Sequence, residues 1–252
     1  MRLHGKVAFV TGGGSGIGRA GAMAMASKGA HVIVTDRDQA AVGNVVERIR
    51  KAGGSGEAEV LDVADDAAIA AVLAGVIDRH GRLDVLHSHV GVQVDGSLEQ
   101  VSVEQMDRSW ALNVRAHFIA ARAVVEQMRR QGGGSIIITA SNSATQIDAG
   151  MIAYTTTKHA AVAMVKQMAK DLAPDNIRVN ALCPGFVDTP FNAGFERQMG
   201  GRSQLEAYIA EAVPMRRFGS AEEIADSILF LASDASRYMT GVAFVVDGGE
   251  NL

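Results

Sequence analysis

Short apolar runs rich in β-branched residues alternate with longer helical patterns along all 252 residues, and this alternation limits the fold more than any other feature. Helical spacing of Ala, Leu, Met and Glu marks segments such as 16–28, 65–80 and 152–173. Strands that are apolar throughout are buried on both faces, and strand–helix alternation gives right-handed crossovers. The pattern predicts an α/β fold with a doubly wound parallel sheet and helices on both faces. The expected strands are residues 6–11, 31–36, 57–63, 83–88, 135–141, 177–183 and 242–248.

We expect one domain over residues 1–252, because no Pro- or Ser-rich linker, charge block or repeat interrupts the alternation. The rhythm lapses only at about 186–218. A long excursion between regular elements usually covers a site, and ligands of open α/β sheets bind beyond the carboxyl ends of the strands. The excursion at 186–218 is therefore expected to cover the substrate.

Composition excludes several classes of partner. The formal charge of −4 gives no basic field, so we expect no nucleic acid. The single cysteine, Cys183, excludes an internal disulfide and a cysteine-based zinc site, and no metal site is expected. No apolar stretch reaches the length of a signal peptide or a membrane span. The sequence thus predicts a cytoplasmic protein without a membrane partner.

A glycine-rich segment, TGGGSGIG at residues 11–18, follows the first expected strand. A strand, a Gly-rich turn and a helix start together aim backbone N–H groups and the positive end of a helix dipole at a phosphate. The spacing GxxxGxG is met by Gly12 for a sharp turn, Gly16 for approach of a pyrophosphate, and Gly18 for tight helix–sheet packing. This indicates a dinucleotide-binding turn of the Rossmann type, and a Gly-rich turn without a ligand is the alternative.

An acidic residue, Asp36, closes the second expected strand eighteen residues after Gly18. A carboxylate there takes both ribose hydroxyls of an adenosine and repels a 2′-phosphate. The Gly turn holds no Lys or Arg that would accept such a phosphate, although Arg37 is adjacent. The pattern favours NAD over NADP, and an ordinary polar strand end is the alternative for Asp36.

The pentapeptide YTTTK places Tyr154 and Lys158 one helical turn apart, where side chains are neighbours on one face. A free tyrosine has a pKa near ~10 and is a poor base at neutral pH. An ammonium at ~4–6 Å, together with a cationic nicotinamide, should lower that pKa. Tyr154 would then take the hydroxyl proton of an alcohol as hydride leaves, and return it in the reverse direction. Two side chains that merely share a helix face are the alternative.

The whole chain resembles the short-chain dehydrogenase/reductase family. All but one of that family's motifs have a counterpart in the same order: TGxxxGxG at Thr11 to Gly18, an acidic Asp36, Asp62–Val63 after the third strand, Asn113, Ser141 thirteen residues before Tyr154, YxxxK at Tyr154 and Lys158, Pro184–Gly185 with Thr189, and VDGG at 246–249. The joint order and spacing make the resemblance specific.

The resemblance implies an NAD(H)-dependent oxidoreductase, an alcohol dehydrogenase/ketone reductase that interconverts a secondary alcohol and its ketone. Ser141 would hydrogen-bond the oxygen on which negative charge develops, with Ser143 as the fallback. Tyr154 would be the general acid/base, and Lys158 would lower its pKa and hold the nicotinamide ribose. Asn113 would relay protons through water and Lys158; a polar core residue that kinks its helix is the alternative.

Further residues follow from the same resemblance. Val187 and Thr189 would meet the nicotinamide carboxamide. The implied cofactor-binding set is Gly12, Ser15, Gly16, Ile17, Gly18, Asp36, Asp62, Val63, Ser88, Gly91, Tyr154, Lys158, Pro184, Gly185, Val187 and Thr189. The implied substrate-binding set is Ser141, Tyr154, Gln146 and Phe191.

The family usually reads NNAG after strand four, whereas this chain has Ser88, His89, Val90 and Gly91 there. Only the glycine is kept, so the hydrogen-bond network that braces the central strands must be rebuilt. His87 and His89 are two apart on a strand and share a face, as half of a metal site would. Without evident further ligands, we expect structural or exposed histidines.

Two other functions stay open at this point. A 3-oxoacyl-carrier reductase using NADPH is opposed by Asp36, and a catalytically silent dinucleotide sensor or scaffold is opposed by the intact Ser141, Tyr154 and Lys158. The expected pocket walls, 146–151 and 186–218, mix aromatic and charged residues and favour neither a sterol nor a sugar. Relatives are commonly homotetramers that pack the helices after strands four and five and the final helix–strand unit, and we expect the same here.

Overall fold

One seven-stranded sheet, in which every neighbouring pair of strands is parallel, forms the centre of the molecule. The computed structural model describes residues 1–252, and the strand order is β3-β2-β1-β4-β5-β6-β7. The strands are β1 (Val7–Thr11), β2 (His31–Asp36), β3 (Ser55–Val60), β4 (Val85–Ser88), β5 (Gly134–Thr139), β6 (Ile177–Pro184) and β7 (Ala243–Val246). The prediction of a single doubly wound Rossmann-type domain is confirmed.

The third strand departs most from its predicted bounds: it spans Ser55–Val60 rather than 57–63. β3 lies at the edge of the sheet, and most of its side chains are partly or fully exposed. The sequence of β3, SGEAEV, contains no continuous apolar run that would mark its bounds. Asp62 and Val63 therefore lie in the connection after the strand.

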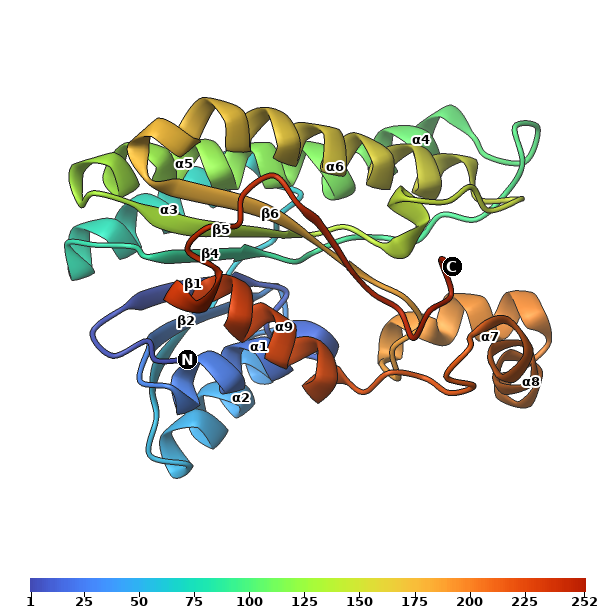
Figure 1. Ribbon diagram of the computed structural model, residues 1–252, viewed down its shortest axis with the longest axis horizontal. Helices are drawn as coiled ribbons and strands as arrows, with labels where there is room; N and C mark the ends of the chain where they lie inside the picture. The colour runs from blue at the N-terminus through green and yellow to red at the C-terminus, as the bar shows by residue number, and fades with distance from the viewer.

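Helices cover both faces of the sheet (Figure 1). α3 (Asp66–His80), α5 (Ala116–Arg130) and α6 (Ile152–Leu172) lie on one face, with α4 (Val103–Trp110) before α5. α1 (Gly16–Ser27), α2 (Gln39–Lys51) and α9 (Ala221–Ala232) lie on the other. The sheet separates two apolar cores, of 27 and 25 buried residues. None of these helices combines the length and apolarity that crossing a membrane demands.

The excursion after β6 is helical rather than irregular. It holds a 3₁₀ turn (Pro190–Asn192), α7 (Ala193–Met199) and α8 (Arg202–Ala212), and stands apart from the helical layers (Figure 1). Leu205, Ile209 and Val213 give it a small core of its own. Two backbone hydrogen bonds through Gly219 close its base, to Asp188 N at 2.9 Å and Phe186 O at 2.9 Å. With seven residues, α7 is too short to show a helical period in the sequence.

Candidate active site

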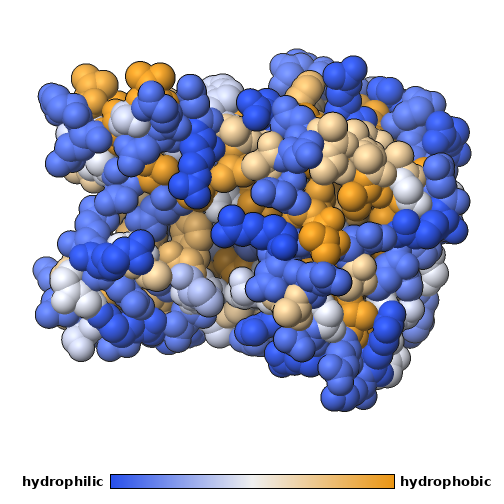
Figure 2. All heavy atoms as spheres, turned by 180° about the vertical axis from the view of Figure 1, so that it is seen from behind, coloured by the Kyte–Doolittle hydropathy of each residue, from blue (hydrophilic) through white to orange (hydrophobic).

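A cavity of about 740 Å³ lies at the carboxyl ends of the strands, where the strand order reverses between β1 and β4. This is where open α/β sheets bind ligands. The molecule is hollowed between two lobes on one side, with an apolar floor (Figure 2). Most of the predicted site residues line the cavity: Gly12, Ser15, Gly16, Ile17, Asp36, Asp62, Val63, Gly91, Ser141, Tyr154, Lys158, Pro184, Gly185, Val187, Thr189 and Phe191.

The glycine turn has the geometry of a phosphate cradle. Gly12 and Gly16 have φ of +66° and +49°, in the left-handed region that favours glycine. A Cβ at Gly18 would lie 2.2 Å from Gly12 O and 2.9 Å from His89 Cδ2, so Gly18 allows α1 to pack closely against the segments that follow β1 and β4. Ser15 precedes α1 without a side-chain cap, and the first turn of α1 holds no acidic residue. The amide groups there suit the phosphates of a dinucleotide.

The carboxylate of Asp36 is held by backbone at the end of β2. Its Oδ2 accepts from Gly14 N and its Oδ1 from Asp38 N, both at 3.2 Å. Asp36 and Arg37 both line the cavity, as do Asp62 and Val63. The adenosine end of the cavity therefore presents a fixed carboxylate beside an arginine.

Tyr154 and Lys158 are buried and line the cavity from α6. Lys158 Nζ lies 5.6 Å from the centroid of the Tyr154 ring and donates to Thr139 O at 3.1 Å. Ser141 follows β5, and its hydroxyl accepts from Ser143 N and donates to Asn142 Oδ1, each at 3.2 Å. Three predicted catalytic residues thus share one wall.

The expected lowering of the Tyr154 pKa is not produced by the protein alone. Burial raises the pKa of Tyr154 to about 12, although the hydrogen bond with Ser141 opposes the shift. Burial also lowers the pKa of Lys158 to about 8. Desolvation disfavours the charged form of each group and is the largest cause of both shifts.

The segment after Ser141 is arranged around Asp148. Ser143 Oγ donates to Asp148 Oδ2 at 2.6 Å, so this fallback hydroxyl is already engaged. Gln146 Nε2 donates to Asp148 Oδ1 at 3.3 Å, and Gln146 does not line the cavity, contrary to its predicted role in substrate binding. Phe191 does line the cavity, its ring centroid 6.4 Å from that of Tyr154.

Asn113 lies in a π-helical turn, Ala111–Arg115, between α4 and α5. Its Oδ1 accepts from Val92 N at 2.7 Å, and its Nδ2 donates to Val92 O and Thr157 Oγ1, both at 3.0 Å. The side chain is fully buried and does not line the cavity. These contacts fix the chain at Val92, and the relay of protons through water and Lys158 stays a prediction.

Neutral imidazoles form the hydrogen bonds near residues 88–91, where the family usually has the asparagines of NNAG. His87 Nε2 and His89 Nδ1 each lie 3.0 Å from Thr139 Oγ1, and Ser88 Oγ lies 2.7 Å from His117 Nδ1. Burial lowers the pKa of His89 to about 4 and that of His117 to about 3, so both are uncharged at neutral pH. Ser88 faces this network and not the cavity, which corrects its predicted place among the cofactor residues.

Sequence reasoning missed several residues of the cavity wall, among them His89, Thr139 and Glu250. His89 and Thr139 line it beside Lys158, and the departure from NNAG was the available signal. Glu250 also lines it, and its Oε2 accepts from Asn142 Nδ2 at 2.8 Å. Burial raises the pKa of Glu250 to about 7. No motif marks this residue, because it reaches the cavity only when the chain after β7 folds back.

Known proteins resemble the chain over nearly its full length. Residues 12–251 match the family described as Enoyl-(Acyl carrier protein) reductase. The chain is 34% identical to an uncharacterized oxidoreductase of Thermotoga maritima, over 99% of this chain and 98% of that protein. It is 36% identical to the 3-oxoacyl-(acyl-carrier-protein) reductase of the same organism, over 99% of each.

A solved structure agrees: 7 alpha-hydroxysteroid dehydrogenase complexed with NADH and 7-oxo glycochenodeoxycholic acid is 32% identical, with a TM-score of 0.92, over 98% of this chain and 95% of that one. Fold and site together define an oxidoreductase with a nicotinamide dinucleotide cofactor. The chain belongs to the short-chain dehydrogenase/reductase family.

Proposed function

We propose that the protein is an NAD(H)-dependent oxidoreductase that interconverts a secondary alcohol and its ketone, with Tyr154 as general acid/base. The observation that carries the proposal is the placing of Ser141, Tyr154 and Lys158 on one wall of the cavity that the glycine turn also lines. When bound, the cofactor accepts or supplies the hydride, and the protein supplies position and charge.

The protonation states suit proton exchange at the substrate oxygen. With a pKa of about 12, Tyr154 is a neutral phenol at neutral pH, the form that donates a proton as a ketone is reduced. Alcohol oxidation requires the phenolate, which the positive charge of an oxidised nicotinamide favours. Ser141 Oγ holds the same oxygen, and Lys158, fixed by Thr139 O, keeps a cation beside the phenol.

Asp36→Ala tests the proposed preference for NAD. We expect the ratio of kcat/KM for NAD to that for NADP to fall roughly 10- to 100-fold, because hydrogen bonds to a charged group contribute about 1.5–3 kcal/mol. Kinetics with each cofactor measure the ratio. Asp38→Ala is the matched control, since that carboxylate caps α2 and does not line the cavity. Unchanged selectivity in Asp36→Ala would remove this residue from the ribose.

The wall of the cavity informs the substrate class. Phe191, Met199 and Tyr208 make it partly apolar, while Asp148 adds a carboxylate, and Glu250, with its pKa raised to about 7, carries part of a negative charge at neutral pH. Like charges repel in a partly buried site, so anionic substrates are disfavoured relative to neutral or cationic ones. We therefore propose a neutral or cationic secondary alcohol, or the matching ketone, of mixed polarity.

Two alternatives have support of their own. A relative named 3-oxoacyl-(acyl-carrier-protein) reductase favours a carrier substrate with NADPH, whereas Asp36 and the acidic wall oppose it. The altered NNAG segment favours a silent dinucleotide sensor, whereas the catalytic wall opposes it. A panel of neutral, cationic and anionic alcohols and ketones plus a 3-oxoacyl thioester, each with NAD and NADP, separates the three. Fastest turnover of the thioester with NADPH supports the first alternative; NADH binding without turnover of any substrate supports the second.

We propose a homotetramer for the assembly. Val103, Trp110 and Phe118 are 72%, 46% and 47% exposed along α4 and α5, which follow strand four. Apolar surface also gathers on the back face of the molecule (Figure 2). Covering such side chains stabilises association. We expect light scattering to give about four times the 26.4 kDa of the chain, and a monomeric mass would contradict the proposal.

A further inference from the structure

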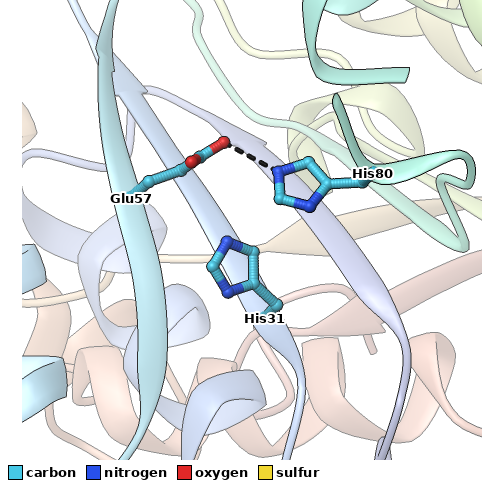
Figure 3. A group of neighbouring side chains, drawn as sticks. All are labelled: His31, Glu57 and His80. Carbon is cyan, nitrogen blue, oxygen red and sulfur yellow. Dashed lines mark hydrogen bonds and ion pairs between the residues drawn. The ribbon is translucent and has the colours of Figure 1, made fainter. Parts of the chain in front are cut away.

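His31, Glu57 and His80 form a cluster toward the amino ends of β2 and β3, whereas the cavity lies at the carboxyl ends of the strands (Figure 3). His31 opens β2, Glu57 lies on β3, and His80 ends α3. One nitrogen of each imidazole and one carboxylate oxygen all lie within 4.8 Å of one another. None of the three lines the cavity, so the proposed oxidoreductase chemistry does not use them.

The ring of His31 is held as a metal-binding imidazole would be. Its Nδ1 lies 2.6 Å from Ser55 Oγ, and its Nε2 is buried without a hydrogen-bond partner. That nitrogen points between Glu57 and His80 (Figure 3). Metal-binding histidines donate their other N–H to a neighbouring acceptor, and Ser55 takes that place here. A buried polar atom without a partner in a native fold calls for a missing water or ion.

Glu57 and His80 supply the other two donors. Glu57 Oε1 accepts from His80 Nε2 and from Arg79 Nη2, both at 3.0 Å, which leaves Oε2 to a further ligand. The imidazoles of His31 and His80 lie with centroids 4.9 Å apart. Two histidines and one carboxylate, with a fourth position for water, are a donor set for Zn²⁺.

We propose that His31, Glu57 and His80 bind one Zn²⁺ ion at a stabilising site that joins β2, β3 and α3. Tetrahedral ligands at about 2.0–2.1 Å from zinc lie roughly 3.4 Å apart, so the cluster must contract. The side chains of Glu57 and His80 are 29% and 22% exposed and have room to turn, while Ser55 fixes His31. Arg79, which competes for Glu57, keeps its ion pair with Glu59 when zinc binds.

Titration of the metal-stripped, full-length protein with ZnCl₂ tests the site. Calorimetry should give one ion per chain, and Co²⁺ should show the visible absorption of tetrahedral coordination. Zinc at a hundredfold excess over its Kd should raise Tm by roughly 5–10 °C. Zinc that binds only the native state of the protein raises Tm in this way, so the test does not depend on an assay of turnover.

Variants decide whether these residues hold the ion. Ser55→Ala should weaken zinc binding about 10- to 100-fold, as loss of an outer partner does, and His31→Ala and Glu57→Gln should weaken it further. His159→Ala is the matched control, since His159 lies on α6 and should leave binding unchanged. Circular dichroism without zinc checks each fold, and Glu57→Gln keeps the side-chain shape if His31→Ala does not fold. No saturable binding by the wild type, or equal binding by Glu57→Gln, overturns the proposal.

Discussion

The Tyr154→Phe variant should lose two to four orders of magnitude in kcat, roughly the contribution of general acid–base catalysis, while its affinity for NADH stays nearly intact. The substitution removes one hydroxyl from a buried ring, and that hydroxyl is the group that exchanges a proton with the substrate. Lys158 Nζ keeps its bond to Thr139 O, so the ribose side of the cavity is preserved. Steady-state kinetics and NADH fluorescence titration measure the two quantities.

Tyr208→Phe is the matched control, because Tyr208 lines the same cavity and loses the same atom. If kcat is near normal in this variant, the loss of kcat in Tyr154→Phe is due to the hydroxyl at position 154 and not to a general decrease in the polarity of the cavity wall. A mild effect in Tyr154→Phe would mean that another residue is the base. Weakened NADH binding with kcat unchanged would place the phenol on the cofactor alone.

Gly18→Ala should weaken dinucleotide binding by more than about 100-fold, the effect of losing several charged hydrogen bonds at once. The new Cβ would lie 2.2 Å from Gly12 O and 2.9 Å from His89 Cδ2. Neither the backbone at Gly12 nor the packed imidazole of His89 can move away easily. The turn must therefore open, and its N–H groups no longer point at the phosphates. Overpacking should also destabilise the fold by roughly 1–3 kcal/mol. NADH titration and thermal unfolding measure both effects.

Gly43→Ala is the control for this substitution. Gly43 lies on α2, and a Cβ there meets nothing within 4 Å. We expect unchanged NADH binding and up to about 1 kcal/mol of added stability, because alanine is the better helix former. Wild-type affinity for NADH in Gly18→Ala would show that the phosphates do not use this turn.

Much of the fold was predictable because the information is local. Four consecutive apolar residues on β1 and three on β2 indicate that both faces of those strands are buried wherever the rest of the chain lies. The spacing of Gly12, Gly16 and Gly18 similarly reports on backbone geometry within one turn. The bounds of β3 were predicted wrongly, since most of its side chains are partly or fully exposed and no apolar run marks the strand.

The sequence predicted which residues form the candidate site better than it predicted the hydrogen bonds that their side chains make. Ser141, Tyr154 and Lys158 lie on one wall because the motif spacing fixes where β5 ends and which face α6 presents. Gln146 and Ser88 were placed wrongly, because a side chain turns toward its best partner, Asp148 or His117, and that partner comes from the folded chain. The raised pKa of Tyr154 in the protein without its cofactor was not predictable, since burial is a tertiary property.

The sequence by itself determined the parallel sheet, the glycine turn, Asp36 at the end of β2, and the Tyr–Lys pair, all of which follow from spacing over a few residues. Only the tertiary structure decided that Glu250 enters the cavity wall and that His31, Glu57 and His80 converge. The physical reason is distance along the chain. These groups come together when separate helices and strands pack against one another, and the spacing of residues within one segment does not show which elements will pack together. Their desolvation, and with it their protonation, is set at the same step.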